Sequence, residues 1–419
     1  MKGRKFAILV SGAPAPGMNA AVLSAAERAS SLGAEAIGIM DGFSGLMKGE
    51  FNAVPLSGFG LHKAHLTGGC IIGSSKANPA SSAEALRNTA DVLAANDVDF
   101  MLVIGGDDSA SALSRLADYA KRMGYAKLCT SFIPKTIDND LPLPMGTKTL
   151  GFETARSAGA KIAETLINDA ASDGCWFIAT TMGMKTGHIA MGIGKAAEAA
   201  VTLVPEAFSK DSKNVISQAA EIIAGSILKR LFCGYSYGVA VVAEGLLHLC
   251  EDRIGISAER DSYGNIRLAQ FDIAGMLKSE VIKKLRRMKI EIPILCKSIG
   301  YEIRGADPCP FDVEYGRNLG YAAAEYLSDG GEGGMIYIEN GKTASVQISS
   351  LIDPESGRIK MRYLNPESLS FKTAVKYMTM LDKSDFADEF RICRLARMAK
   401  MTPAEFRKEF EFSESFSLL

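Results

Sequence analysis

Short apolar runs alternate with stretches of helical periodicity over most of the chain. The apolar runs have the length and composition of buried strands, and they fall at Phe6–Val10, Met101–Ile104, Leu128–Ile133, Cys175–Thr181, Tyr237–Ala243 and the stretch from Ile294. Several are followed by a glycine turn and then by apolar positions at the helical spacing. Further helices are expected at Ser81–Ala95, from Phe152 onwards, at Asn214–Lys229 and at Phe311–Leu327.

This alternation predicts an α/β fold with mainly parallel sheets, arranged as two similar three-layer domains with the active site in the cleft between them. We expect one domain to contain residues 1–149 and about 303–345. The second would contain residues 150–302 and 346–419. Asn340-Gly341 predicts a β-hairpin, and the charged C-terminal segment reads as helical, with Pro403 at a helix start.

The composition is that of an ordinary soluble protein. The 419 residues carry 47 Lys plus Arg against 48 Asp plus Glu, so the net charge of −1 gives no bulk attraction to nucleic acid or to an anionic membrane. No segment is apolar for the roughly 18 to 20 residues of a membrane span, and the apolar run after the N-terminus is too short for a signal peptide. The eight cysteines form no C-x-x-C pair, which favours reduced thiols and a cytoplasmic location.

The stretch from Val98 to Asp140 carries the densest chemistry. The strand that ends at Ile104 leads through Gly105 and Gly106 into a helix, and such a turn offers backbone N–H groups and a positive helix end to a phosphate. Two acidic residues lie in this turn, and a lysine and further acidic residues follow the next strand: Asp107, Asp108, Lys135, Asp138 and Asp140. Carboxylates beside a phosphate-binding turn indicate a metal ion or a proton transfer.

Two other segments have the composition of phosphate sites. Gly68–Lys76 is a glycine- and serine-rich loop that ends in a cation, and such a loop holds phosphate between N–H groups and positive charge. Lys297, Tyr301 and Arg304 place three polar donors within eight residues, and an arginine fork matches the paired oxygens of a phosphate.

The segments IGGDDS and PKTIDND resemble the two signature segments of the phosphofructokinases, specifically of their pyrophosphate-dependent branch. ATP-using members carry glycine at the positions of Asp108 and Lys135. The resemblance extends from about residue 6 to about residue 330. It departs from the family pattern at Met184, which stands where the family has an arginine, and at Ser11, which replaces a usual glycine.

The resemblance implies that the first expected domain binds the phosphoryl donor and a metal ion and that the second binds the sugar phosphate. It also implies a role for each matching residue near the donor. Asp138 would be the general base, Asp140 would orient it, and Thr136 would hydrogen-bond the moving group. Lys135 would offset charge on the donor, as would Lys76, while Asp107 would hold Mg²⁺. Donor binding would also involve the following residues: Gly12, Gly106 and Asp108.

For the sugar phosphate, the resemblance and the local chemistry together indicate Met182, Gly183, Glu244, Lys297, Tyr301 and Arg304. The expected reaction is reversible phosphoryl transfer from pyrophosphate to the 1-hydroxyl of fructose 6-phosphate, in glycolysis. We expect Mg²⁺ as cofactor and a homo-oligomer, either dimer or tetramer, with no nucleic acid or membrane partner.

Two alternatives stay open from the sequence. One is an ATP-dependent sugar-phosphate kinase of the same fold. The other is a non-catalytic phosphofructokinase-like subunit or sugar-phosphate sensor, which Met184 suggests. A dinucleotide oxidoreductase is disfavoured, because no G-x-G-x-x-G follows the first strand.

Overall fold

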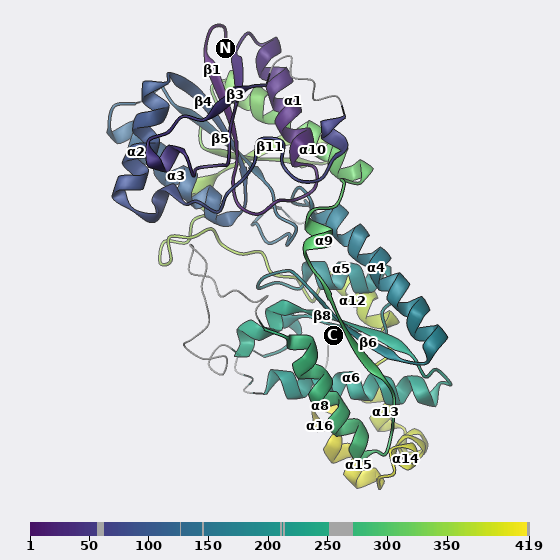
Figure 1. Ribbon diagram of the computed structural model, residues 1–419. Coiled ribbons are helices and arrows are strands. Elements are labelled where there is room, and N and C mark those ends of the chain that lie inside the picture. Colours follow the sequence, from purple (N-terminus) through teal and green to yellow (C-terminus); the bar gives the residue numbers. More distant parts are fainter. Residues whose placement is uncertain are drawn as a thin grey trace. The chain divides into compact units, whose positions relative to one another are not determined.

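The computed structural model describes residues 1–56, 63–125, 127–144, 146–209, 212, 214–250 and 271–416 (Figure 1). These residues divide into two compact units. The described part of unit 1 contains residues 1–56, 63–125, 127–144, 146–155 and 301–362. That of unit 2 contains residues 156–209, 212, 214–250, 271–300 and 363–416.

Unit 1 is built on a sheet with the strand order β11-β10-β5-β4-β1-β2-β3. Its strands are β1 (Lys5–Val10), β2 (Glu35–Ile39), β3 (Ala53–Pro55), β4 (Val98–Gly105), β5 (Cys129–Pro134), β10 (Gly334–Glu339) and β11 (Lys342–Gln347). The pairs from β10 to β2 are parallel, whereas β3 and β11 pair antiparallel at the two edges. The residues of β1 and β4 that follow the first strand position are nearly all buried on both sides, as expected for parallel strands covered by helices.

Helices cover both faces of this sheet, with α1 and α10 on one and α2 and α3 on the other (Figure 1). The helices of unit 1 are α1 (Met18–Ser31), α2 (Ala83–Ala95), α3 (Asp107–Arg122), α9 (Tyr301–Arg304), α10 (Pro310–Ser328) and α11 (Ile348–Leu351), with 3₁₀ turns η1 (Leu46–Lys48), η2 (Ala64–Leu66) and η3 (Pro79–Ser81). Helices α1 and α10 approach so closely that a Cβ at Gly320 would lie 2.3 Å from the carbonyl oxygen of Ala21. Glycine is therefore required at this point of the helix contact.

Unit 2 is built on a smaller sheet with the order β7-β8-β6-β9, in which all pairs are parallel. Its strands are β6 (Trp176–Thr181), β7 (Val201–Leu203), β8 (Gly238–Ala243) and β9 (Ile294–Ile299). Helix α5 packs on one face and α6 and α8 on the other (Figure 1). The helices of this part of the chain are α4 (Phe152–Asp173, which begins in unit 1), α5 (His188–Ala196), α6 (Val215–Phe232), α8 (Ile273–Arg287), α12 (Leu369–Tyr377), α13 (Lys383–Ala387), α14 (Glu389–Met398), α15 (Pro403–Glu409) and α16 (Glu411–Ser415), with 3₁₀ turns η4 (Pro205–Ala207) and η5 (Glu244–Cys250).

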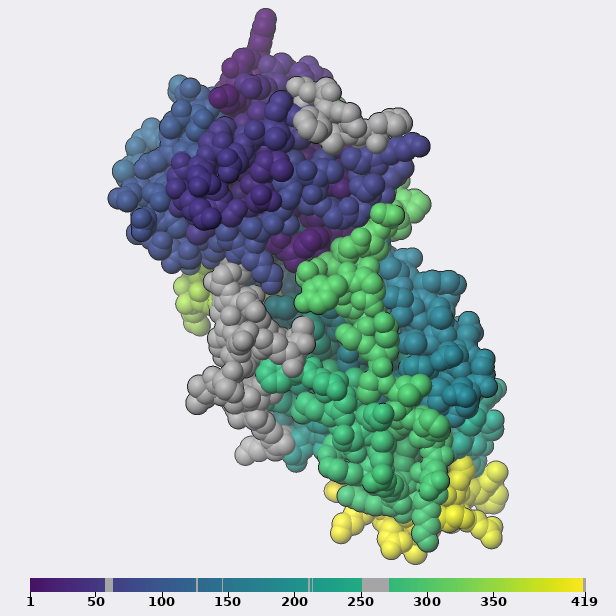
Figure 2. Space-filling view, viewed as in Figure 1, coloured from purple at the N-terminus to yellow at the C-terminus, as the bar shows by residue number. Residues whose placement is uncertain are grey.

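The C-terminal helices are attached to unit 2 by two ion pairs of Lys229, of which the one with Asp385 is buried. Lys229 of α6 donates to Asp385 at 2.6 Å and to Asp382 at 3.0 Å, and Asp385 is only 1% exposed. Helices α14 and α15, yellow in Figure 2, lie at the surface of this unit. Because a half-removed buried ion pair is costly, this contact fixes the C-terminal segment on α6.

The predicted α/β class with mainly parallel sheets is confirmed, and so are the hairpin at Asn340-Gly341 and the helix that begins at Pro403. The predicted domain boundary was wrong for residues 346–362, which lie in unit 1. They do so because Ile348 N–H bonds the Gly333 carbonyl beside β10, and Arg362 bonds the loop after β5. No helix in the described part of the chain combines the length and hydrophobicity that a membrane crossing requires.

Asp312 is expected to stabilise the start of α4. Its fully buried carboxylate accepts hydrogen bonds from Gly151 N–H at 2.9 Å and from Thr154 N–H at 2.7 Å, as well as from the Thr154 hydroxyl. Asp312→Ala leaves these donors unpaired, so we expect the free energy of unfolding to fall by about 3 kcal/mol, measured by urea unfolding followed by circular dichroism. Asp329→Ala, at an exposed site after the same helix α10, is the control and should change stability by less than about 0.5 kcal/mol. Equal effects of the two substitutions would contradict the role of Asp312.

Candidate active site

Three parallel strands of unit 1 end side by side at one edge of the sheet. β1, β4 and β5 are neighbours, and they lead into Ser11-Gly12, Gly106–Asp108 and Lys135–Asp140. The chain leaves β1 through α1 on one face and leaves β4 through α3 on the other (Figure 1). The strand order therefore reverses between β1 and β4, and in open α/β sheets ligands bind at this point.

The turn between β4 and α3 is a tight one. A Cβ at Gly105 would lie 2.5 Å from Cβ of Ser109, so only glycine fits there. The Ser109 hydroxyl bonds the Ser11 hydroxyl at 2.9 Å, which joins the turn after β4 to the turn after β1. Asp107 and Asp108 form the first turn of α3, where its N–H groups and dipole create positive potential. The predicted strand, glycine turn and helix are thus confirmed.

Lys135 is buried, and its side chain bonds the turn after β1. The side chain belongs to a residue that is 3% exposed, and its Nζ donates to the Ser11 carbonyl at 3.0 Å and to the Ala13 carbonyl at 2.5 Å. A Cβ at Gly12 would lie 3.4 Å from this Nζ, and Gly12 has a φ of 87°. Burial lowers the pKa of Lys135 to about 8, an effect that Arg304 increases and Asp138 and Asp107 oppose. This ammonium is therefore held in place by backbone carbonyls among acidic side chains.

The loop after β5 gathers two of the predicted acidic residues. The Thr136 hydroxyl accepts the N–H of Asp138 at 3.0 Å, which turns the backbone immediately after Lys135. Asp140 is 8% exposed. Burial raises its pKa well above the usual range, and the negative charges of Asp138 and Asp107 raise it further. The charges of Asp138 and Asp107 thus act against ionisation of Asp140, and a cation bound at this edge would offset them.

Within the described residues no group of three or more His, Cys, Asp and Glu side chains has the arrangement of a metal site. Mg²⁺ is usually held by one or two carboxylates together with substrate phosphates, so it needs no such group. The hard oxygen donors of Asp107 and its acidic neighbours fit this mode of binding.

The glycine- and serine-rich loop lies beside the turn after β1. The Ser75 carbonyl accepts the N–H of Gly12 at 2.8 Å, so this N–H is already used within the protein and leaves Gly12 to contribute space rather than a donor. Asn19 fixes the first part of the loop, with its amide donating to the Thr67 carbonyl and its oxygen accepting Ile71 N–H. Lys76 at the end of the loop is exposed.

In unit 2, carboxylates hold the turn that follows β6. Glu244, directly after β8, accepts the N–H groups of Gly183 at 3.2 Å and of Met184 at 3.1 Å. Met184 adopts a φ of 50°, and Met182 N–H bonds the end of β9 at the Ile299 carbonyl. The structure therefore brings together three of the predicted sugar-phosphate residues, and it assigns Glu244 a backbone-holding contact that the sequence did not indicate.

The remaining predicted residues lie on β9 and directly after it. Lys297 is exposed on β9. Tyr301 and Arg304 form the first and last residues of the short helix α9, and the Arg304 guanidinium lies 4.8 Å from the centre of the Tyr301 ring. Arg304 belongs to unit 1, as does Lys135, whose pKa it lowers.

Two residues that hold these loops, one in each unit, were missed in the sequence. Glu206 in η4 accepts Gly187 N–H and Leu364 N–H through one carboxylate oxygen, and burial raises its pKa. Arg362 bonds the loop that contains Asn139. Glu206 could have been found from the sequence, because it is a charged residue in an otherwise apolar segment. Arg362 could not, because its segment has no recognisable periodicity.

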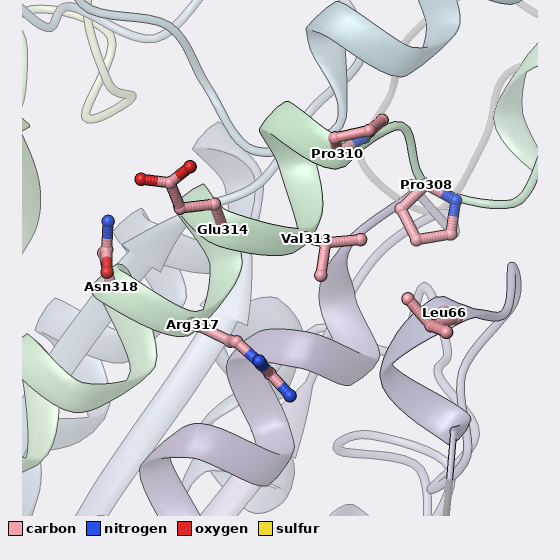
Figure 3. A pocket seen from close by; sticks show the side chains of 7 residues that line it. All are labelled: Leu66, Pro308, Pro310, Val313, Glu314, Arg317 and Asn318. Carbon is pink, nitrogen blue, oxygen red and sulfur yellow. The ribbon is translucent and has the colours of Figure 1, made fainter.

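A shallow depression of about 380 Å³ lies elsewhere in unit 1, between η2 and the start of α10 (Figure 3). It is lined mainly by Leu66, Pro308, Pro310 and Val313, with Arg317 at its rim. None of the predicted site residues lines it, so it is separate from the carboxylate-rich edge.

Comparison with known proteins agrees with this geometry. A family model described as Phosphofructokinase matches residues 5–327. The pyrophosphate--fructose 6-phosphate 1-phosphotransferase of Thermotoga maritima is 37% identical over 97% of this chain and 98% of its own length, and the protein of the same name from Naegleria fowleri is 35% identical over 97% and 94%. Relatives named ATP-dependent 6-phosphofructokinase are 28% to 29% identical.

A solved structure shares the fold. The crystal structure of a pyrophosphate-dependent phosphofructokinase from Marinobacter aquaeolei superposes with a TM-score of 0.67 over 90% of both chains, at 20% identity. With the family model matching most of the sequence and full-length relatives above one-third identity, this chain belongs to the phosphofructokinase family.

Proposed function

We propose that this chain catalyses reversible phosphoryl transfer from pyrophosphate to the 1-hydroxyl of fructose 6-phosphate, giving fructose 1,6-bisphosphate and phosphate, as a step of glycolysis. The most similar relatives reported above carry the name of this activity along nearly the whole chain. The observation that carries the proposal is the buried Lys135 ammonium between the turn after β1 and the acidic start of α3. A cation there suits a short, highly charged donor.

In the proposed mechanism Asp138 accepts the proton of the sugar 1-hydroxyl as that oxygen attacks the terminal phosphorus. The bond to the bridging oxygen breaks, and phosphate leaves. Asp140 orients Asp138, and the Thr136 hydroxyl, which already accepts Asp138 N–H, donates a hydrogen bond to the moving group. A carboxylate suits this task because it can take up the proton as negative charge develops on the attacking oxygen.

Asp107 would hold Mg²⁺ at the first turn of α3. When bound, the ion neutralises charge on the phosphate oxygens. Lys135 and Lys76 would offset the remaining charge of the donor. Gly12 and Gly106 have no side chains, so the donor can approach the two turns closely. A Cβ at Gly12 would also be in contact with the Lys135 ammonium.

Donor choice is assigned to Asp108. A carboxylate placed where ATP would put its α-phosphate excludes that phosphate by volume and by like charge, whereas pyrophosphate ends before it. Lys135 fills part of the same space, being buried against the carbonyls of Ser11 and Ala13.

Six residues are proposed to bind the sugar phosphate. The turn at Met182 and Gly183, held by Glu244, supplies a fixed backbone, and a hydroxyl of the sugar is assigned to Glu244 itself. Lys297, Tyr301 and Arg304 would bind the 6-phosphate, for which the arginine fork gives paired hydrogen bonds.

The working form is proposed to be a cytoplasmic homo-oligomer, either dimer or tetramer. The support is β9, which is at the edge of the unit 2 sheet as ordered among the described residues. Leu295 in this strand is 41% exposed, and the next three residues are exposed as well. A partly apolar edge strand is a ready surface for another chain.

The non-catalytic alternative rests on Met184. The methionine removes a cation from the family position, but its N–H is still held by Glu244 and the acidic edge of unit 1 is intact. The ATP-dependent alternative is opposed by Asp108 and Lys135 together.

The first prediction tests the reaction and its base. Purified protein with fructose 6-phosphate and Mg²⁺ should form fructose 1,6-bisphosphate with pyrophosphate and not with ATP. Asp138→Asn should lower kcat by at least about 10²-fold with little change in KM, because the amide cannot accept the proton. Turnover with ATP alone would contradict the donor assignment, and no turnover with either donor would favour the non-catalytic alternative.

The second prediction concerns donor choice. Asp108→Gly alone should not create an efficient ATP enzyme, because Lys135 still occupies the site. The double variant Asp108→Gly, Lys135→Gly should gain ATP turnover over the single variant. Measured kcat/KM values for both donors decide, and efficient ATP use by Asp108→Gly alone would refute the role of Lys135.

The third prediction concerns pH. Since the Lys135 ammonium is present below its pKa of about 8 and lost above it, kcat/KM for pyrophosphate should fall as pH rises through that value. Lys135→Arg stays protonated and should not show this fall. Measuring both proteins in the same buffers removes the titration of pyrophosphate itself, and profiles of identical shape would show that Lys135 does not control donor use.

A further inference from the structure

Arg362 closes unit 1 and lies beyond the residues that the family model matches. It is half-buried, and burial lowers the pKa of its guanidinium. Hydrogen bonds to protein groups replace those to water at its buried nitrogens. None of the roles proposed above uses this residue.

Its side chain binds the loop after β5 at several points. Nε and Nη2 donate to the Asn139 carbonyl at 3.1 and 2.9 Å, and Nη2 also donates to the Asn139 side-chain oxygen. Nη1 donates to the Thr147 carbonyl at 2.9 Å and to the Leu143 carbonyl at 3.3 Å. The backbone N–H of Arg362 bonds the Asp140 carbonyl at 2.7 Å. One residue therefore contacts both sides of the loop.

Asn139 has a φ of 56°, in the left-handed region that most residues avoid but that asparagine adopts more readily than other non-glycine residues. Its side-chain oxygen also accepts Thr149 N–H at 3.1 Å, and the Thr149 hydroxyl bonds the Thr136 carbonyl at 2.7 Å. Asn139 separates Asp138 from Asp140, so its backbone angles set the direction in which each carboxylate leaves the chain.

Charge places Arg362 in the same group of residues. Burial lowers the pKa of Arg362, and the charges of Asp140 and Tyr315 oppose this. Burial raises the pKa of Asp140, the charges of Asp138 and Asp107 raise it further, and Arg362 lowers it. Arg362 is the positive group among these residues, and its charge offsets the effect of the Asp138 and Asp107 carboxylates on Asp140.

We propose that Arg362 is a positioning residue that holds the left-handed turn at Asn139 and so aims Asp138 at the sugar hydroxyl. This inference rests on the proposed function, in which Asp138 is the base. A planar guanidinium with donors on three nitrogens is needed to reach carbonyls on both sides of the loop at once, and the single nitrogen of a lysine cannot do this.

The test compares Arg362→Lys, Arg362→Ala and Arg362→Gln with the wild type in the pyrophosphate assay. We expect kcat to fall about 10²-fold in the alanine and glutamine variants and at least about tenfold in the lysine variant, with KM for pyrophosphate within about threefold, because a displaced base slows the chemical step rather than binding. Added guanidinium chloride, at concentrations that do not unfold the protein, should partly restore Arg362→Ala and leave Lys360→Gln unchanged. Lys360 is the control, since it is exposed on the same segment.

Amide hydrogen exchange gives a readout that does not depend on turnover. Exchange in residues 136–144 and 146–149 should be faster in Arg362→Gln than in the wild type, with no change in the strands of unit 1. If the wild type turns over no pyrophosphate, the proposed function fails, whereas unchanged exchange overturns the inference about Arg362. Wild-type kcat in Arg362→Lys, or a loss of kcat that only follows a lower melting temperature, would also overturn it.

Discussion

The interaction on which the site of unit 1 depends is the pair of hydrogen bonds from the Lys135 ammonium to the carbonyls of Ser11 and Ala13. A buried cation without partners would be costly, and these carbonyls, with the nearby carboxylates, replace the water it has lost. The bonds join the end of β5 to the turn after β1, and the Ser11–Ser109 contact continues the connection to α3. One buried charge thus orders the turns that carry the acidic residues. Its burial lowers the pKa of Lys135 to about 8.

A second constraint is shared by both units: the loops that contain the predicted site residues adopt conformations held by side chains from later in the chain. Glu244 accepts the N–H groups of Gly183 and Met184, where Met184 has a positive φ. In unit 1, Arg362 donates to the carbonyl of Asn139, which also has a positive φ. In each case a charged group satisfies backbone atoms that a strand or helix would otherwise have paired, because irregular backbone near a buried site needs such partners.

Much of the fold followed from the pattern of the sequence. Buried parallel strands such as β4 are continuous apolar runs, so the strand was predicted, although as Met101–Ile104 rather than its full Val98–Gly105. The helix expected from Phe152 begins at that residue. The short strands β2 and β3 were not predicted, since five- and three-residue elements give weak patterns. The position of residues 346–362 was missed because strand pairing between β11 and β10, and the bonds of Arg362, are made with residues distant in the sequence.

The sequence by itself determined which residue types stand at the strand ends, and with them the acidic and basic character of the site, because motifs such as IGGDDS and PKTIDND are local. Only the tertiary structure decided how those residues are used. The N–H of Gly12 is committed to Ser75, Glu244 holds the turn at Gly183, and Arg362 binds the loop at Asn139. These contacts join segments up to 223 residues apart, and a pattern read along the chain contains no information about partners at that separation.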